Sequence, residues 1–296
     1  MNKPIKKVVI LTNFNIYDKA SAALKVARGF SDLGCELYTL SYNKEKMSRT
    51  LKGRNNVDFN FVSPEEMYEL ADAVIVLGGD GTILDAARRA APYKVPVMGI
   101  NLGRLGYLAE LEIGELDALC ELVSGNYRLE KRSMIDIEIV DPQGNVRKNE
   151  YALNDAVLSN GSISRIVDLE LYEGGVQVAS YRSDGMIIST PTGSTAYSLA
   201  AGGAIVDPRL NCLCVTPICP HSLHARPLIF PDDASIEIKN VCQREKSLFL
   251  TVDGRVNHEV FAFEKVRVTR SVLQTQFIRL KDFGFYERLR QKMIDR

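Results

Sequence analysis

The chain has 296 residues, and its 37 basic side chains balance 37 acidic ones, so the formal net charge at pH 7 is zero. Hydrophobic residues make up 46% of the chain and charged residues 25%, which is typical of a soluble globular protein with a sizeable core. The balanced charge argues against nucleic acid or a membrane surface as the main partner, although it allows a local basic site for phosphates.

The beginning of the chain places basic side chains before a short apolar run, Val8 to Leu11. This run is far shorter than the apolar core of a secretory signal or a membrane span, so we expect a first β-strand here. The six cysteines include Cys212, Cys214 and Cys219, whose spacing matches no zinc-binding pair. We therefore expect buried, reduced thiols and a cytoplasmic protein.

Strands and helices alternate in the first hundred residues or so. The patterns predict strands over 6–13, 35–40, 72–79 and 95–101, and helices over 20–33, 64–70, 82–90 and 114–125. Ser63 is the expected N-cap of the second helix, with Pro64 at its first position. The strand over 72–79 is apolar on both faces, which is typical of a central strand in a parallel sheet. The alternation predicts a Rossmann-like, doubly wound sheet.

After about residue 126 the pattern changes to short strands with alternating polarity. It predicts a hairpin over 132–159 around the turn DPQGN, strands over 166–183, 185–190, 213–218, 234–240, 247–254 and 265–271, one helix near 194–203, and a helical tail over 282–296. We therefore predict an α/β plus all-β chain. Residues 1–125, with about 275–296 returning to them, form the parallel-sheet domain, and residues 126–274 form a mainly antiparallel β domain.

The stretch VIVLGGDGTILDAAR contains a glycine-rich turn between a buried strand and a helix. Ligands bind at this place in open α/β sheets, and the first amides of the helix can receive phosphate oxygens. The turn matches neither common phosphate loop, and Asp80 would itself repel a phosphate. From the residues alone, Asp80 either handles a proton or a cation, or it merely caps its own helix.

A second turn, Pro191 to Thr195, is rich in small residues and precedes a predicted helix. We expect it to expose hydroxyls and amides and to present Tyr197 as a flat partner for a purine. The alternative is a plain strand-to-helix turn with Tyr197 in the core.

The motif GGDGT after an apolar strand resembles a superfamily of kinases without a Walker loop, which includes NAD kinases, diacylglycerol and sphingosine-type lipid kinases, and phosphofructokinases. The segment RSDGMIISTPTGSTAYSLAAGGAIVDP, residues 182–208, resembles the long signature of NAD kinases. ALNDAVLSNG, TPICPHSLHARPLI and GINLGRLGYLAE also resemble stretches of this family. The resemblance to NAD kinases covers essentially the whole chain.

This resemblance implies a transfer of the γ-phosphoryl group of ATP to the 2′-hydroxyl of the adenosine ribose of NAD, which gives NADP and ADP and depends on Mg²⁺ or another divalent cation. It implies that Asp80 is the general base, and it assigns no metal ligand. On the phosphate-donor side it implies Gly78, Gly79, Gly81 and Thr82. For NAD it implies Asp80, Gly81, Asn154, Asp155, Arg165, Arg182, Asp184, Thr195, Ala196, Tyr197, Ser198, Leu199 and Ala200. It also implies a homo-oligomer, a dimer or a tetramer.

The chain departs from the family pattern at two positions: Asp155 stands where Glu is usual, and Arg255 where Gln is common. Two other functions share parts of the pattern, a lipid or small-alcohol kinase with the same glycine turn and a non-catalytic dinucleotide sensor. The sequence leaves open ATP or polyphosphate as donor, NAD or NADH as acceptor, and feedback by NADPH.

Overall fold

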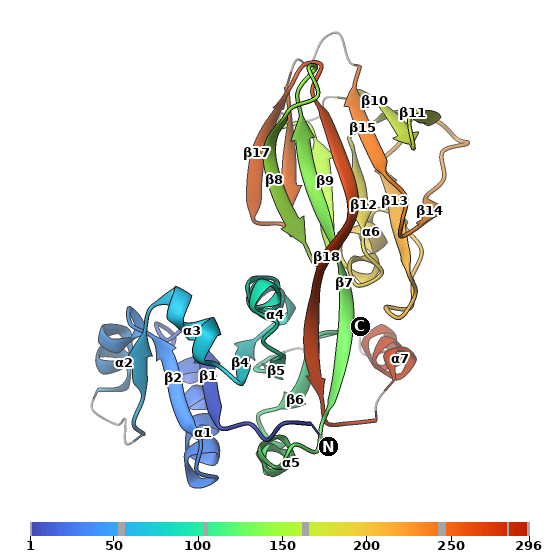
Figure 1. Ribbon diagram of the computed structural model, residues 1–296. Coiled ribbons are helices and arrows are strands. Elements are labelled where there is room, and N and C mark those ends of the chain that lie inside the picture. The colour runs from blue at the N-terminus through green and yellow to red at the C-terminus, as the bar shows by residue number, and fades with distance from the viewer. Residues whose placement is uncertain are drawn as a thin grey trace. The chain divides into compact units, whose positions relative to one another are not determined.

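The computed structural model describes residues 2–52, 57–103, 106–161, 166–241, 247–282 and 284–294. The chain divides into two compact units, residues 1–131 with 275–296, and residues 132–274. The chain passes from one unit to the other within two long strands, β7 (Arg128–Val140) and β18 (Lys265–Arg279), which Figure 1 shows in green and dark red.

The first unit is built on parallel strands. Their order is β3 (Asn60–Val62), β2 (Glu36–Leu40), β1 (Lys7–Leu11), β4 (Ala73–Gly78) and β5 (Val97–Asn101), and β6 (Ala109–Glu112) also pairs with β5. All six residues of β4 are buried, and this strand pairs in parallel with β1 and β5. An apolar run with no polar face therefore forms the centre of the sheet, as predicted.

The helices described in the first unit are α1 (Tyr17–Asp32), α2 (Asn43–Leu51), α3 (Pro64–Leu70), α4 (Asp80–Ala90), α5 (Leu119–Ser124) and α7 (Phe285–Ile294), with 3₁₀ turns η1 (Ala91–Tyr93) and η2 (Leu116–Ala118). Helices α1 to α5 have buried apolar residues, whereas α7 has none among its described side chains. Ser63 caps α3 as predicted, because its hydroxyl accepts from the amide of Glu66 and the Glu66 carboxylate accepts from the amide of Ser63.

The second unit consists of antiparallel strands in two sheets. One contains β8 (Val146–Ala152), β10 (Val167–Glu173), β11 (Val176–Ser183) and β15 (Ile236–Asn240) together with β7 and β18; the other has the order β14 (Leu228–Pro231), β13 (Cys212–Ile218), β12 (Gly185–Ser189), β9 (Asp155–Ser159), β16 (Ser247–Val252) and β17 (Val256–Phe261). The only helical pieces described there are η3 (Gly193–Thr195) and α6 (Tyr197–Ala200).

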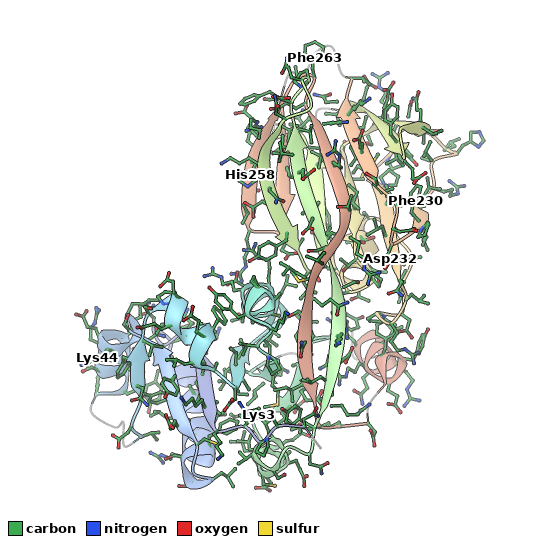
Figure 2. All side chains as sticks on the ribbon, viewed as in Figure 1. Lys3, Lys44, Phe230, Asp232, His258 and Phe263 are labelled. Atoms are coloured by element: carbon green, nitrogen blue, oxygen red, sulfur yellow. The ribbon has the colours of Figure 1, made fainter. Side chains whose placement is uncertain are left out.

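The inner faces of the two sheets share one apolar core. It contains Ile137 of β7, Leu169 of β10, Ile188 of β12 and Leu250 of β16, all of which are buried. Alternation along each strand sends these side chains to the same interior, as in aligned sandwiches. His258 of β17, labelled in Figure 2, also joins the sheets, because its Nε2 lies 2.9 Å from Oε1 of Glu150 on β8.

The α/β plus all-β fold class is confirmed, including the helical tail that belongs to the first unit. One α-helix and four strands were not predicted, namely α2, β3, β6, β14 and β17, and neither was the 3₁₀ turn η1. Helix α2, NKEKMSRTL, buries only Asn43, Met47 and Leu51, so its apolar signal is weak. Strand β18 extends to Arg279 rather than stopping near Ser271, and α4 begins at Asp80 rather than at Thr82.

Candidate active site

The glycine turn of the first unit joins β4 to α4. Gly79 is the N-cap of α4 with extended backbone (φ −93°, ψ 178°), and Asp80 is the first helical residue. Helix α4 is anchored in the first unit by its buried apolar side chains, among them Ile83 and Leu84. The turn therefore lies at the carboxyl end of a central parallel strand and at the positive end of an eleven-residue helix.

The Asp80 carboxylate does not cap its own helix. Oδ2 accepts a hydrogen bond from the amide of Tyr107 at 2.9 Å, and Oδ1 accepts one from the amide of Leu108 at 3.1 Å. The ammonium group of Lys292, on α7, lies 3.4 Å from Oδ2. The helix-capping alternative for Asp80 is therefore wrong. The side chain is instead held by two backbone amides and one cation.

Gly106 is what permits the Asp80 carboxylate to lie here. A Cβ added at Gly106 would be 2.0 Å from Oδ1 of Asp80. A side chain at this position would push the carboxylate away from the amides of Tyr107 and Leu108. The small residue just before these two amides is thus a local requirement of the Asp80 geometry.

Packing requires a glycine at one position of this turn but not at the other two. A Cβ at Gly78 would lie 3.0 Å from Oγ1 of Thr82, so internal packing accounts for that glycine. At Gly79 and Gly81 an added Cβ would meet no described heavy atom within 4 Å, and both residues are exposed. Packing within the described chain does not require glycine at these two positions.

The second unit contains a cavity of about 410 Å³. Its lining residues come from β9 and the residue before it, from the beginning of α6, and from the end of β16 and the turn that follows. They are Asn154, Asp155, Val157, Ser159, Ala196, Tyr197, Thr251, Asp253 and Gly254. Four of the predicted NAD-binding residues, Asn154, Asp155, Ala196 and Tyr197, therefore line one cavity.

The turn Pro191 to Thr195 brings α6 to this cavity. Its backbone approaches β9 so closely that a Cβ at Gly193 would lie 2.1 Å from the carbonyl oxygen of Asn154. The Thr190 amide donates to the same carbonyl at 2.9 Å, and the Thr190 hydroxyl donates to the carbonyl of Leu153 at 2.6 Å. Gly193 and Thr190 thus fix α6 next to Asn154.

Two expectations for this turn have different outcomes. The expectation of exposed hydroxyls is wrong for Ser194 and Thr192, which are 0% and 6% exposed, whereas Thr195 is partly exposed. The Ser194 hydroxyl donates to the carbonyl of Pro191 and accepts from the amide of Val206, so it stabilises the turn. Tyr197 is 47% exposed, and the alternative that places its ring in the core is wrong.

Asp155 and Asp253 are the acidic groups of the cavity. Asp253 accepts hydrogen bonds from the amides of Leu153, Asn154 and Asp155 at 3.0, 2.8 and 3.2 Å. Its carboxylate therefore fixes the backbone where β9 begins. Asp155 is only 4% exposed. Burial, and then the nearby negative charge of Asp253, raise the pKa of Asp155 from 3.8 to about 7.

The other predicted NAD-binding residues do not line the cavity among the described residues. Arg182 at the end of β11 and Asp184 in the next turn are exposed, and Ser198 is buried with its hydroxyl 3.0 Å from that of Thr216. Thr195 donates to the carbonyl of Thr192 at 3.3 Å. Leu199 and Ala200 complete α6 without lining the cavity, as far as the described residues show. Arg165 lies outside the described residues.

Thr251, Asp253 and Gly254 were missed as site residues. Their signal was present in the sequence as TVDG, a strand that ends in an acidic turn. Asp253 and Gly254 have positive φ values of 48° and 66°. A tight hairpin between β16 and β17 therefore aims the Asp253 carboxylate back at the amides of β9.

A protein-built metal cage is not found in the described part of the chain, where no group of three or more His, Cys, Asp and Glu side chains comes together. A divalent cation for phosphoryl transfer would fit as one held mainly by donor phosphates and water, the usual arrangement for Mg²⁺. Cys212 and Cys214 are buried free thiols, as predicted, whereas Cys219 is free but exposed, so the prediction of burial is wrong for it. In the described residues, no helix is long and apolar enough to cross a membrane.

Comparisons with known families match both halves of the chain. Residues 8–127 match the family model of the ATP-NAD kinase N-terminal domain, and residues 153–280 match that of the ATP-NAD kinase C-terminal domain. The NAD kinase of Carboxydothermus hydrogenoformans is 44% identical over 230 residues, 77% of this chain and 81% of the relative. The NAD kinase of Caldanaerobacter subterraneus is 34% identical over 293 residues, 99% of this chain and 100% of the relative.

Two solved structures share the fold. The structure of yeast NADH kinase complexed with NADH superposes with a TM-score of 0.86 at 26% identity, covering 98% of this chain and 88% of that one. An Archaeoglobus fulgidus NAD kinase in complex with ATP gives a TM-score of 0.66 at 23% identity, covering 97% of each chain. The matches in both halves show that this chain belongs to the NAD kinase family.

Proposed function

We propose that this chain phosphorylates NAD by transferring the γ-phosphoryl group of ATP to the 2′-hydroxyl of the adenosine ribose, giving NADP and ADP, with Asp80 as general base. Family membership makes the chain a kinase that acts on NAD. The observation that carries the finer proposal is the cavity lined by Asn154, Asp155, Ala196 and Tyr197, residues that the family resemblance links to NAD.

The cavity offers chemistry suited to an adenosine group. The half-exposed ring of Tyr197 provides a flat apolar surface for a purine. Asn154 and Asp155 provide polar groups at the start of β9, where Asp253 fixes the backbone. Arg165, Arg182, Asp184, Thr195, Ser198, Leu199 and Ala200 remain proposed contacts of the dinucleotide.

In the first unit, the glycine turn has the features of a phosphate-facing site. We assign Gly79, Gly81 and Thr82 to the donor side, because the amides of a helix N-terminus attract anions. Gly78, the buried last residue of β4, is assigned to this side on the family resemblance alone. A Cβ added at Gly79 or Gly81 would meet no described heavy atom within 4 Å, which leaves room for a phosphate on that side of the backbone. The two amides that bind the Asp80 carboxylate hold it in a fixed orientation.

The reaction is a direct in-line transfer. The ribose 2′-hydroxyl loses its proton to the Asp80 carboxylate, its oxygen bonds to the γ-phosphorus, and the bond from that phosphorus to the bridging oxygen of ADP breaks. Positioning and charge neutralisation supply most of the catalysis in such transfers. A bound Mg²⁺ would neutralise donor phosphate charge.

The replacement Asp80→Asn tests the role of Asp80. We expect NADP formation to fall by about 10²- to 10⁴-fold, because a positioned base contributes about that much. NAD binding, followed by titration calorimetry, should persist. Turnover close to that of the original protein would remove Asp80 from the mechanism. An original protein that forms no NADP from NAD, ATP and Mg²⁺ but binds NAD would be a sensor instead.

We also propose a cytoplasmic homo-oligomer. The five described cysteines are free, which fits a reducing compartment. The second unit has strands β11 and β17 at sheet edges, and such edges are commonly covered by a partner. Light scattering on the purified chain tests the assembly, and a monomer at micromolar concentration would contradict it.

A further inference from the structure

The C-terminal helix brings a cation to the glycine turn. Lys292 lies on α7, and its Nζ is 3.4 Å from Oδ2 of Asp80. The same ammonium group lies 3.7 Å from the centroid of the Tyr107 ring, the residue whose amide binds Asp80. Two different interactions thus locate Lys292 at the carboxylate of the proposed base, more than two hundred residues away in the sequence.

Helix α7, which carries this lysine, is joined to β6 through Arg288. Arg288 lies one helical turn before Lys292 and therefore on the same face. The Arg288 guanidinium bonds to Glu110 at 2.8 Å, and the Glu110 side chain is 0% exposed. Because Glu110 belongs to β6, directly after Tyr107 and Leu108, one face of α7 contacts the segment that orients Asp80.

The positive charge of Lys292 offsets the negative charge of Asp80 at the glycine turn. A carboxylate beside the amides that are to receive phosphates repels those phosphates, and the repulsion is strong in a partly buried site. The Asp80 side chain is 33% and the Lys292 side chain 22% exposed, so their attraction is screened less than that of a surface pair. The pair is close to neutral as a whole.

We infer that Lys292 is a positioning residue of the phosphoryl-transfer site, which orients the Asp80 carboxylate and offsets its charge so that the polyphosphate of the donor can bind next to it. This inference rests on the proposed function and adds a residue outside the glycine turn and the dinucleotide signature. In this proposal Lys292 acts through Asp80 rather than through a contact of its own with the donor.

A double-mutant cycle on donor binding tests this role. The replacement Lys292→Met keeps the apolar stem near Tyr107 and removes the charge. We expect the Kd for MgATP, measured by titration calorimetry, to rise about tenfold, as for the loss of one partly buried charge pair. In an Asp80→Asn background the repulsion is absent, and Lys292→Met should then change the Kd by less than about twofold.

Two further variants separate charge from helix docking. Lys292→Arg should keep the Kd within about threefold of the original value, because it restores the cation. Arg290→Gln removes a charge from an exposed position of the same helix and should leave MgATP binding unchanged. If Lys292→Met lowers the melting temperature, Lys292→Gln replaces it in the cycle.

The inference is overturned if Lys292→Met and Lys292→Gln bind MgATP like the original protein. It is also overturned if Arg290→Gln weakens binding equally, or if Lys292→Met weakens binding equally in the Asp80→Asn background. The last result would mean a direct contact with phosphate. Since the original protein is assayed separately for NADP formation, failure of the proposed function is distinguished from failure of this inference.

Discussion

The buried Asp155 makes stability depend on pH in a direction that can be worked out. Its pKa in the folded chain is raised to about 7 from 3.8, first by burial and then by the charge of Asp253. Between about pH 4 and pH 7, Asp155 is therefore protonated in the folded state and ionised in the unfolded state. Because the folded state binds more protons there, stability falls as pH rises through this window.

The size of the effect follows from proton linkage. A rise of the pKa from 3.8 to about 7 corresponds to about 4 kcal/mol between fully protonating and fully ionising conditions. Between pH 5 and pH 8 the fall attributable to Asp155 is about 2–3 kcal/mol. The replacement Asp155→Asn keeps the shape and removes the ionisation, so this part of the pH dependence should disappear.

The assay is urea unfolding of the original chain and of Asp155→Asn at pH 5, 6, 7 and 8. The difference between the two free energies of unfolding should shift in favour of Asp155→Asn by about 2–3 kcal/mol from pH 5 to pH 8. Asp233→Asn, at an exposed position of the same unit, serves as the control and should show no such shift. Parallel pH profiles for the original chain and Asp155→Asn would refute the reasoning.

Two other substitutions test the cavity of the second unit. Gly193→Ala places a Cβ 2.1 Å from the carbonyl oxygen of Asn154 and should lower the free energy of unfolding in urea by about 1–3 kcal/mol. The control is Gly114→Ala, where a Cβ meets no described atom within 4 Å and stability should not change. Equal effects of the two substitutions would contradict the close packing at Gly193. Tyr197→Ala should raise the Kd for NAD about tenfold in calorimetry, and Tyr197→Phe should keep it near the original value; unchanged binding by Tyr197→Ala would remove the ring from the site.

Much of the fold followed from patterns that involve neighbouring residues. The apolar run of β4, the Ser63 cap and the hairpin around Asp141–Asn145 each depend on residues a few positions apart. Such local preferences are set by periodicity and turn chemistry, which the sequence displays directly. The family resemblance, carried by long contiguous motifs, was readable for the same reason.

The elements missed have weak local signals. Helix α2 is mostly polar, and β3 has three residues, none of them buried. Strand β6 follows the glycine-containing stretch after β5 and forms because it pairs with that strand. The local propensity of these segments is too weak to specify a helix or strand, so sheet pairing and packing against the rest of the chain determine their secondary structure.

The sequence by itself determined that an acid stands in a glycine turn after a central strand, and it identified the family. Only the tertiary structure decided what that acid contacts, because its partners Tyr107, Leu108 and Lys292 are 27, 28 and 212 residues away. The same holds for Asp253, whose carboxylate binds amides about a hundred residues earlier in the chain. Hydrogen bonds between distant segments exist only once packing has brought those segments together, and one residue's neighbours in sequence carry no record of them.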